Sequence, residues 1–361
     1  MKNLVPKRRF EEFKDSDPWE QRKLKDMTDY KNGKGHEDRQ SNSGKYELVN
    51  LNSISINGGL KHSGKFVDDA SDTLLENDLV MVLSDVGHGD LLGRVALIPE
   101  DDRFVLNQRV ALLRPNDTVD PQFLFSCINA HQQYFKSQGA GMSQLNISKG
   151  SVENFTSYVP HKKEQAKIGA FFRNLDHLIT LHQRKLDKLK ETKSAYLSEM
   201  FPKEGELYPK RRFAGFTDPW EQRKLGDIAG RYDNLRIPVT ASNRIPGATP
   251  YYGANGIQDY VDGFTHNGEF VLIAEDGAND LKNYPVHYVN GKVWVNNHAH
   301  VIQALEGISD NKFLKYSFKT LNIEPYLVGG GRAKLNANIM MDLVINTPTI
   351  NEQIKIGEFF S

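Results

Sequence analysis

The sequence contains a single cysteine and no run of apolar residues that approaches the roughly 20 needed to span a bilayer. One cysteine excludes a framework of disulfides, and no grouping of His and Cys has the spacing of zinc ligands. Because Met1–Leu4 does not open a signal peptide, we expect a cytoplasmic protein with no membrane partner. The net charge is zero, so contact with a polyanion would depend on local basic clusters and not on a global field.

Motifs for group-transfer chemistry are also lacking. Gly329–Arg332 is rich in glycine but does not end in the Lys-Ser/Thr of a phosphate loop, and the Asn/Asp-Pro-Pro-aromatic motif of an adenine methyltransferase is absent. Asp85 and Asp276 each follow an apolar run, and we interpret them as turn residues and not as catalytic carboxylates. We therefore predict no catalytic residue and no enzymatic activity in this chain.

Two further groups of residues could carry chemistry but have simpler explanations. His298 and His300 lie two apart and would share one face of a strand, as a ligand pair does. No third ligand is evident near them in the sequence, so we predict no metal site. Cys127 lies in the apolar run Phe123–Ile128, which favours a small buried residue over a nucleophile.

What the chain does contain is a repeat. Two blocks of the N-terminal region, Pro6–Phe10 and Asp17–Leu24, return as Pro209–Phe213 and Asp218–Leu225. Further along each copy, Glu164-Gln165, Lys167–Gly169 and Phe171-Phe172 return as Glu352-Gln353, Lys355–Gly357 and Phe359-Phe360. The stretches between the shared blocks are nearly unrelated. A constant frame around divergent inserts indicates one scaffold that presents two different recognition surfaces, and it argues against a single active site.

The repeat predicts two domains of similar plan and an α+β fold class. The first domain spans 1–160 (lead segment 1–29, variable region 30–160), a long spacer helix spans 161–202, the second domain spans 203–348 (lead segment 203–229, variable region 230–348), and 349–361 starts a second spacer helix that is cut short. The excess of basic over acidic residues lies in 161–200, between the two variable regions.

Short apolar runs between turn residues predict strands followed by a helix in each variable region. In the first region the strands are Tyr46–Leu51, Leu79–Leu83, Arg94–Ile98 and Val110–Leu113, and the helix is Phe123–Phe135. In the second they are Phe270–Ala274, Val286–Val289, Val293–Val295 and His300–Ala304, with a helix at Lys312–Leu321. The polar, glycine-rich stretch from Lys31 to Lys45 predicts an exposed loop. The divergent regions are therefore expected to share one mixed α/β fold.

The spacer helix shows the spacing of a coiled coil. Apolar residues recur at intervals of four and three in a narrow seam, which is typical of a helix that packs against one partner helix. The seam consists of Leu175, Ile179, His182, Leu186, Leu189, Lys193, Tyr196 and Met200, and Pro202 and Gly205 end the helix. A helix of this kind extends about 40 Å from Leu175 at 1.5 Å per residue, which is enough to hold two domains apart.

With these features the chain resembles the DNA-specificity (S) subunit of type I restriction-modification systems, over essentially its whole length. The resemblance depends on two variable domains and on the helix entry Pro160, Glu164-Gln165, Ile168, which recurs as Pro348, Glu352-Gln353, Ile356. Three stretches of the second variable region are also similar to such a domain: Arg236–Pro238, Pro250–Gly256 and Trp294–His298. Each motif is weak alone, but their duplicated order is specific.

The resemblance implies a function and a set of partners. Each target-recognition domain would read one half of a split, asymmetric site in double-stranded DNA, and two antiparallel helices would set the spacing between the halves. Two methylation subunits would bind the chain and carry S-adenosylmethionine, and restriction subunits with ATP and magnesium would complete the enzyme. No cofactor is expected on this chain. Because the second helix stops at Ser361, the seam lacks a partner from the same chain, and a self-dimer through it is a further hypothesis.

Candidate DNA-binding residues fall in three groups. Arg and Lys read guanine or phosphate, Asn and Gln read adenine, and glycines allow the backbone to approach a phosphate. The groups are the loop with Lys31, Lys34, Arg39 and Lys45; the glycine-containing stretches with Gln144 and Lys149 in the first domain and Arg332 and Lys334 in the second; and Arg236, Arg244, Tyr251 and Asn255. The loop also suits an ordinary solvated surface, and the tyrosines also suit core positions.

Two other functions are compatible with parts of the pattern. A coiled-coil scaffold with two protein-binding heads explains the helix and the duplication, but it does not explain the matched helix entries. A hydrolase with two active sites requires corresponding acid and base residues in both variable regions, and Asp85 and Asp276 correspond only loosely. The DNA-specificity interpretation accounts for the most residues.

Overall fold

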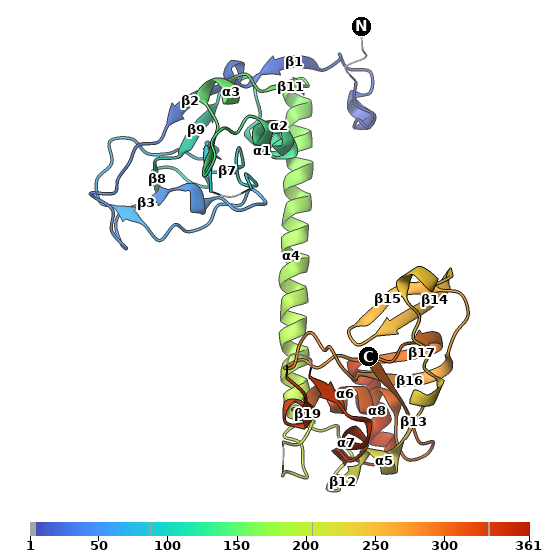
Figure 1. Ribbon diagram of the computed structural model, residues 1–361. Coiled ribbons are helices and arrows are strands. Elements are labelled where there is room, and N and C mark those ends of the chain that lie inside the picture. The colour runs from blue at the N-terminus through green and yellow to red at the C-terminus, as the bar shows by residue number, and fades with distance from the viewer. Residues whose placement is uncertain (1–4, 87, 204, 331–332) are drawn as a thin grey trace. The chain divides into compact units, whose positions relative to one another are not determined.

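The computed structural model describes all residues of the chain except 1–4, 87, 204 and 331–332. The chain divides into two compact units, Met1–Gln183 and Arg184–Ser361. Figure 1 shows the elements of both units in chain order. Within the described ranges, no helix has the length and apolar character required to cross a membrane.

A short antiparallel ribbon closes the frame of the first unit. Strand β1 (Glu20–Lys23) follows the lead segment and pairs with β11 (Thr156–Val159), which precedes the long helix α4 (Lys162–Met200). At the start of α4, the buried carboxylate of Glu164 accepts two hydrogen bonds from Arg9, at 2.8 and 2.7 Å. The lead segment is thereby bound to the base of a helix that begins about 150 residues later.

The described part of the first variable region contains a four-stranded sheet, a three-stranded sheet and a two-stranded pair, together with short helices. The four-stranded sheet has the order β2 (Thr28–Asn32), β9 (Val110–Pro115), β5 (Leu79–Val82), β7 (Val95–Leu97), and the three-stranded sheet has the order β4 (Phe66–Val67), β3 (Tyr46–Val49), β8 (Phe104–Leu106). A separate pair joins β6 (Ser84–Asp85) to β10 (Leu145–Asn146), and the helices are α1 (Pro121–Ala130), α2 (Gln132–Ser137) and α3 (Lys149–Glu153).

The central position of β5 explains its unbroken apolar sequence. Leu79 and Met81 pack into one hydrophobic cluster, and Val80 and Val82 pack into another. Because successive side chains of a strand point to opposite faces, a strand that is covered on both faces needs apolar residues at every position.

The second unit repeats the frame. Strand β12 (Glu221–Lys224) pairs with β21 (Val344–Thr347), which precedes α8 (Ile350–Phe360). Arg212 donates two hydrogen bonds of 2.7 Å to Glu352 of α8, in the same way as Arg9 binds Glu164. The shared sequence blocks therefore build the same contacts in both units.

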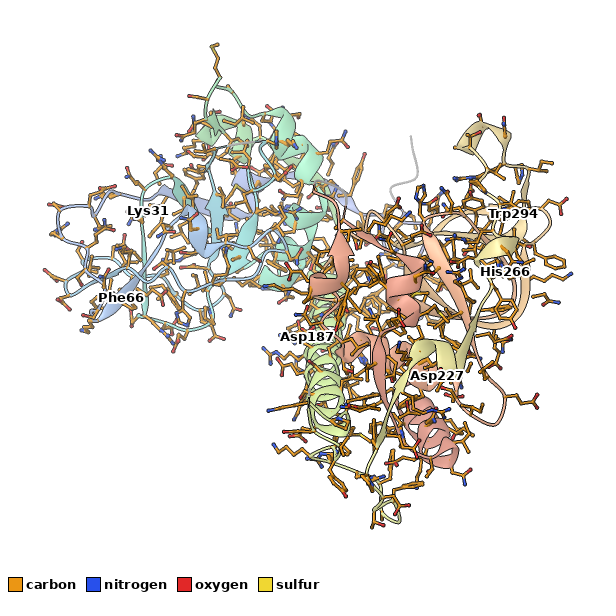
Figure 2. All side chains as sticks on the ribbon, turned by 60° about the horizontal axis from the view of Figure 1, so that its bottom comes forward. Lys31, Phe66, Asp187, Asp227, His266 and Trp294 are labelled. Atoms are coloured by element: carbon orange, nitrogen blue, oxygen red, sulfur yellow. The ribbon has the colours of Figure 1, made fainter. Side chains whose placement is uncertain are left out.

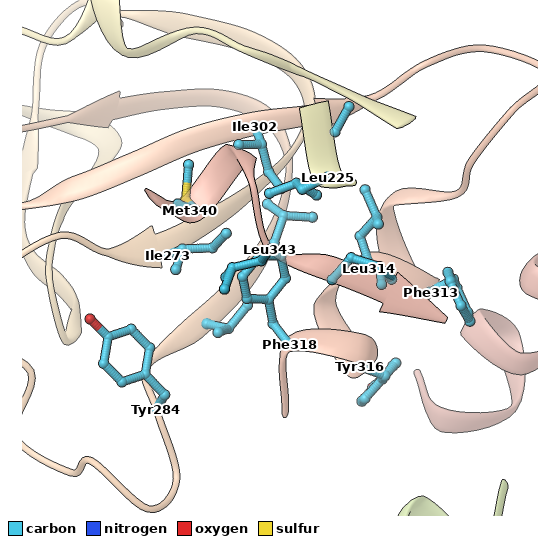
Figure 3. Close-up of a cluster of buried hydrophobic side chains, with 14 of the residues drawn as sticks. Leu225, Ile273, Tyr284, Ile302, Phe313, Leu314, Tyr316, Phe318, Met340 and Leu343 are labelled. Atoms are coloured by element: carbon cyan, nitrogen blue, oxygen red, sulfur yellow. The ribbon is translucent and has the colours of Figure 1, made fainter. Parts of the chain in front are cut away.

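The variable region of the second unit is built on one six-stranded sheet. Its order is β13 (Ala229–Arg231), β18 (Ala299–Ala304), β16 (His266–Ala274), β17 (Val286–Val295), β14 (Pro246–Gly253), β15 (Gly256–Val261). The pair β19 (Leu327–Val328) and β20 (Lys334–Leu335) and the helices α5 (Leu225–Ile228), α6 (Asn311–Thr320) and α7 (Ala337–Met341) complete it. Figure 3 shows how Ile273 and Ile302 of the sheet lie near Phe318 and Leu314 of α6 and near Met340 of α7 in the core.

Helices α4 and α8, the frame helices, each contain a glycine where they pack against a helix of the variable region. A Cβ atom added at Gly169 of α4 would lie 2.7 Å from Oδ1 of Asp120, which caps α1, and one added at Gly357 of α8 would lie 2.6 Å from Oδ1 of Asp310, which caps α6. Both distances are shorter than a Cβ atom tolerates. The repeated Ile-Gly pair of the frame is therefore a close-packing position.

Helix α4 is continuous for 39 residues, and much of its predicted seam faces solvent. Leu175, Ile179, Leu186 and Leu189 are 38, 66, 46 and 56% exposed, and His182 and Lys193 are also exposed. The last seam residues differ, because Met200 is buried in the core of the second unit and Tyr196 packs against that core. The exposed part is an apolar face without a covering element among the described residues.

The predicted α+β class is confirmed, and some element boundaries are corrected. Val286–Val289 and Val293–Val295 belong to one strand, β17, and the predicted helix Phe123–Phe135 is two helices that break at His131. The loop predicted from Lys31 is largely exposed, but Lys31 lies in β2 opposite Leu112 of β9. A Cβ at Gly33 would lie 1.7 Å from the carbonyl oxygen of Asn107, so this glycine permits close backbone packing and does not mark a flexible segment.

Candidate nucleic-acid interface

A polar groove of about 640 Å³ in the first unit gathers three of the predicted DNA contacts. Lys31, Lys34 and Arg39 line it together with Asp69 and Asp72. Lys31 forms an ion pair with Asp72, whereas Lys34 is exposed and Arg39 is 64% exposed with Asp38 at 4.0 Å. The acidic groups weaken the electrostatic attraction of the groove for phosphate. They also make the groove more selective, because a DNA ligand has to place its phosphates near the cations and away from the carboxylates.

The remaining candidates of the first unit lie outside this groove. Lys45 places its ammonium over the ring of Tyr46, 4.8 Å from the centroid. Lys149 opens α3, forms an ion pair of 3.5 Å with Glu153 and lies over the ring of Tyr30. Both side chains are accessible, so both remain available for a phosphate contact.

Gln144 lies at the end of a glycine-containing turn that β10 closes. Its side-chain nitrogen donates to Oδ1 of Asn146 at 3.2 Å. Gly141 has φ of 132°, and a Cβ there would lie 2.0 Å from the carbonyl oxygen of Gln144. The turn therefore requires glycine for its own geometry, whether or not a phosphate approaches it.

In the second unit the predicted contact Arg236 is engaged inside the domain. It follows a 3₁₀ turn at Asp233–Leu235, and its guanidinium lies 2.6 Å from the carboxylate of Glu275 and donates to the carbonyl of Ala299 at 2.8 Å. The side chain is 15% exposed. Its donors already have partners inside the domain, which does not favour a direct contact with DNA, and the prediction that Arg236 reads DNA stays untested.

Arg244 and Tyr251 also have internal partners. Tyr251 is 1% exposed, and its hydroxyl accepts from the backbone N–H of Val239. The guanidinium of Arg244 lies over the Tyr251 ring at 4.1 Å and pairs with Asp259 at 3.3 Å. A side chain as buried as Tyr251 cannot reach a DNA groove, so we remove it from the candidate contacts. Arg244 keeps only a small accessible part, with its side chain 15% exposed.

Asn255 connects two loops of the second unit. Its amide nitrogen donates to the carbonyl of Gly277 at 2.9 Å, and its oxygen accepts from the backbone N–H of Asn279 at 3.0 Å. These bonds fix the side chain from both ends. Arg332 is also predicted to contact DNA. It lies outside the described residues, and its role stays a prediction.

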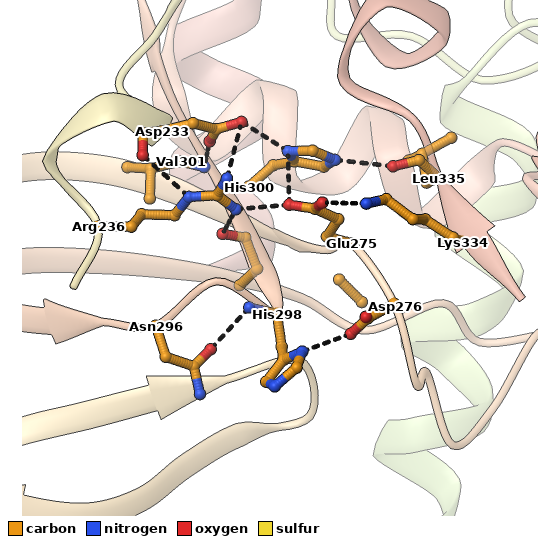
Figure 4. A network of polar contacts seen from close by, with 12 residues as sticks. Asp233, Arg236, Glu275, Asp276, Asn296, His298, His300, Val301, Lys334 and Leu335 are labelled. Atoms are coloured by element: carbon orange, nitrogen blue, oxygen red, sulfur yellow. Dashed lines mark hydrogen bonds and ion pairs between the residues drawn. The ribbon is translucent and has the colours of Figure 1, made fainter. Parts of the chain in front are cut away.

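Lys334 belongs to a cluster of charged residues at one end of the sheet, drawn in Figure 4. Its ammonium lies 2.8 Å from Glu275, and Nδ1 of His300 lies 2.7 Å from Asp233. Burial raises the pKa of Glu275, but the hydrogen bonds from Lys334 and Arg236 outweigh it and hold the pKa below its ordinary value. Burial likewise raises the pKa of Asp233, but the hydrogen bonds from His300 and from the backbone of Val301 outweigh it and hold this pKa below its ordinary value.

The same cluster corrects the expectation that His300 has no further ligands near it. Oxygen or nitrogen atoms of Asp233, Glu275 and His300 lie within 4.8 Å of one another, as in a metal site. Sequence reasoning missed them because the carboxylates arrive from segments far away in the chain. Arg236 and Lys334 already bind Glu275, however, and neutralise the charge that a cation would need. The cluster fits an internal ion-pair network better than a metal site.

Cys127 is only half-buried, unlike the prediction of a fully buried residue. It lines a mainly apolar groove of about 840 Å³ in the first unit, with Trp19, Phe123 and Phe172. The corresponding rings of the second unit, Trp220 and Phe313, are instead covered by Phe201, whose centroid lies 5.8 Å from each. Figure 2 shows the side chains of each unit on the ribbon.

Comparison with known proteins agrees with the duplicated frame. The family model of the type I restriction modification DNA specificity domain matches residues 16–191 and again 217–361. The chain belongs to this family. The two matches cover both variable regions and the frame blocks from Asp17 and Asp218 onward, so the family resemblance inferred from the sequence is confirmed.

Relatives in this DNA-specificity family come from bacteria and archaea. A putative type I restriction enzyme specificity subunit of Haemophilus influenzae is 45% identical over 136 residues, which are 38% of this chain and 35% of the relative. A putative specificity subunit of Methanocaldococcus jannaschii is 23% identical over 226 residues, 58% of this chain and 52% of the relative. The chain thus matches about a third to a half of the length of these relatives.

Solved structures share the fold of this specificity-domain chain. The S subunit of a type I restriction-modification system from M. genitalium superposes with a TM-score of 0.69 at 16% identity and covers 100% of this chain and 91% of that one. A chain from a structure describing complex assembly and conformational transition of the type I R-M system gives a TM-score of 0.51 at 15% identity and covers 95% and 89%. At these identities the likeness concerns the fold.

Proposed function

We propose that this chain is a DNA-specificity subunit that reads a bipartite, asymmetric duplex site, with one half-site for each domain. The observation that carries the proposal is the repeated frame. Arg9–Glu164 and Arg212–Glu352 fix the two domains to their helices in the same way, while the regions between these contacts have different sheets. The same ion pair recurs around two different variable regions. This arrangement suits a protein whose two domains recognise different DNA sequences.

In the first domain, the groove with Lys31, Lys34 and Arg39 is the proposed DNA contact, supported by the exposed Lys45 and Lys149. In the second domain it is the segment Gly329–Leu335, of which all residues except 331–332 are described. Basic side chains supply phosphate and guanine contacts, and the grooves supply shape selectivity. The scaffold with two protein-binding heads is not favoured, because the specificity family accounts for both domains.

The chain is proposed to be non-catalytic and to act in the cytoplasm as part of a larger enzyme. Two methylation subunits with S-adenosylmethionine would modify the site, and restriction subunits with ATP and magnesium would cleave DNA. The exposed apolar face of α4 (Leu175, Ile179, Leu186 and Leu189) is the proposed contact for a partner helix, either from these subunits or from a second copy of the chain.

Mapping of methylated bases tests the proposed function. The chain is co-expressed with its methylation subunits, and modified adenines are located by single-molecule sequencing. Two short blocks that flank a fixed gap are expected. Replacing region 230–348 by that of a relative should change one block and leave the other block and the gap unchanged. A single contiguous block, or an unchanged pattern after the replacement, would contradict the proposal.

A further inference from the structure

One buried carboxylate holds the base of the glycine-containing segment in the second domain. Glu275 follows β16, and its side chain is 12% exposed. One oxygen accepts from the ammonium of Lys334 at 2.8 Å, and the other accepts from the guanidinium of Arg236 at 2.6 Å (Figure 4). Lys334 is therefore held by an acceptor that is itself fixed by a second cation.

The backbone around Lys334 is fixed by the same segments. The N–H of Leu335 donates to the carbonyl of Glu275 at 2.7 Å, and Asp276 forms an antiparallel bridge with Lys334. Nε2 of His300 lies 2.8 Å from the carbonyl of Leu335, which can only accept a hydrogen bond. The strand β20 is consequently tied to the end of β16 and to β18.

A second layer fixes the partners of Glu275. Asp233 accepts from the backbone N–H of Val301 at 2.8 Å and binds Nδ1 of His300 at 2.7 Å, and Arg236 donates to the carbonyl of Asp233. Side chains that are held by several groups keep one conformation, which is the requirement for a preorganised contact.

Lys334 is the most accessible charged group of this network. Its side chain is 45% exposed, whereas that of Arg236 is 15% exposed. An ammonium carries three donors, and one of them binds Glu275. Among the described residues, Glu275 is the acceptor assigned to this ammonium, so the other two donors can serve an acceptor outside the domain, such as a phosphate oxygen or the O6 and N7 atoms of guanine.

The first domain closes its corresponding segment without such an ion pair. Ser84 of β6 donates to Oδ1 of Asn146 of β10 at 2.6 Å, and Asp85 accepts from the backbone N–H of Leu91. Gln144, which takes the place of Lys334, bonds to Asn146. In the part of the chain that the structure describes, only the second domain has a buried carboxylate that forms an ion pair with a residue of this segment.

We propose that Glu275 is a positioning residue for DNA reading: it orients Lys334 toward an acceptor in the second half-site. The inference rests on the proposed function and adds a residue that does not itself touch DNA. Lysine has a long flexible side chain, and holding it in place before binding lowers the entropy lost on binding. Simple electrostatics predicts the opposite, because removal of a negative charge near DNA should tighten binding.

The test measures binding of the full chain to duplexes by fluorescence anisotropy at fixed salt. The duplexes carry the mapped site, single substitutions in either half-site, or an unrelated sequence. For Glu275→Gln we expect binding to the mapped site to weaken about 5- to 100-fold, the range of a lost base contact. Discrimination in the first half-site should stay within about twofold. Loss at one base pair with unchanged binding to unrelated DNA indicates a base contact, and a uniform loss that includes unrelated DNA indicates a phosphate contact.

Asp342→Asn is the matched control, because it removes the same charge from the exposed ion pair of Asp342 with Lys224. Lys334→Ala should reproduce the loss, and adding Glu275→Gln to it should cause no further loss. Lys334→Arg keeps the charge at an accessible site and should also weaken binding, which provides a readout if Glu275→Gln does not fold. Equal or tighter binding by Glu275→Gln, additive losses in the double variant, or full binding by Lys334→Arg overturns the inference. If the wild-type chain does not prefer the mapped site, the proposed function itself fails.

Discussion

Arg212 and Glu352 form a buried bidentate ion pair across 140 residues of sequence, with both hydrogen bonds at 2.7 Å. Arg9 and Glu164 form its counterpart in the first unit at 2.8 and 2.7 Å. In each unit the arginine comes from the lead segment and the glutamate from the first turn of the frame helix. These pairs make the two domains comparable, because each variable region lies between the two partners of one pair.

Removal of Glu352 should destabilise the second domain. Glu352→Ala leaves the guanidinium of Arg212 without its carboxylate, and loss of one partner of a buried pair costs about 3 kcal/mol or more in free energy of unfolding. Urea denaturation followed by hydrogen exchange should locate the loss in residues 203–361. Lys224→Ala, which removes an exposed pair, should change stability by less than about 1 kcal/mol. Equal effects of the two variants would contradict the structural role of the pair.

A methyl group at Gly357 should loosen the contact of α8 with α6. The added Cβ would lie 2.6 Å from Oδ1 of Asp310 and 3.1 Å from the N–H group of Phe313 that this oxygen caps. Overpacking of this kind costs about 1–3 kcal/mol. Thermal unfolding of Gly357→Ala should show a lower Tm, although alanine is the better helix former. Gly150→Ala in α3 is the control, because a Cβ there would lie 3.9 Å from Oγ of Ser148, an ordinary contact distance. An unchanged Tm for Gly357→Ala would show that the Asp310 side chain moves aside at little cost, and it would contradict the close-packing role of Gly357.

The exposed seam of α4 should govern association. Leu189 is 56% exposed, and Leu189→Glu introduces a charge where a partner helix would pack. In sedimentation velocity we expect the wild-type chain to associate and this variant to do so much less, with both Tm values similar. Ala195→Glu makes the same change in charge on another face of the helix. A wild-type chain that sediments as a monomer of ordinary stability would argue against self-association.

Lys34 should contribute to DNA affinity through phosphate contact. Lys34→Ala removes one exposed cation from the groove of the first domain and should weaken binding to all duplexes alike. The slope of log K against log salt should fall in magnitude by about 1, because one fewer counterion is released. Lys61→Ala, outside that groove, serves as the control. A loss confined to one base pair would assign Lys34 to base reading instead.

Acid should destabilise the second domain through Glu275 and Asp233. Both pKa values lie below their ordinary values of 4.5 and 3.8, because hydrogen bonds from charged or backbone donors outweigh the effect of burial. A lowered pKa in the folded state gives a contribution to stability that is present above the unfolded value and is lost as the pH falls through the folded value. Unfolding at pH 7 and below pH 4.5 should reveal this loss, and Glu275→Gln should make the dependence less steep. An equally steep dependence in that variant would exclude Glu275 as a source.

Much of the frame could be predicted from local patterns. The repeated Glu-Gln, Ile-Gly and Phe-Phe pairs marked the starts of α4 and α8, and the apolar run Leu79–Leu83 predicted a buried strand. The family and the α+β class followed from the order of these blocks. Local patterns could not show that β17 is a single strand, because Asn290-Gly291 between its apolar ends has the composition of a turn.

The candidate site was less predictable. Basic residues in polar stretches were identified as DNA contacts by type alone, and Lys31, Lys34 and Arg39 do share one groove. Tyr251 and Arg236 have residue types that suit a DNA contact, but Tyr251 is buried and Arg236 is paired with Glu275 from another segment. The residue type indicates which hydrogen bonds and ion pairs a side chain is able to form. Its neighbours in the folded structure decide which of them it forms.

The sequence by itself therefore determined the duplicated frame, the long helix and the family, since these depend on short-range periodicity and on identical residues that recur in order. The tertiary structure alone decided which charges are internal. Asp233, Arg236, Glu275, His300 and Lys334 come from four places in the chain, and the ion pairs between those places exist only because the six-stranded sheet and β20 bring them together. Electrostatic pairing depends on distances of a few ångströms, which residue order along the chain does not specify.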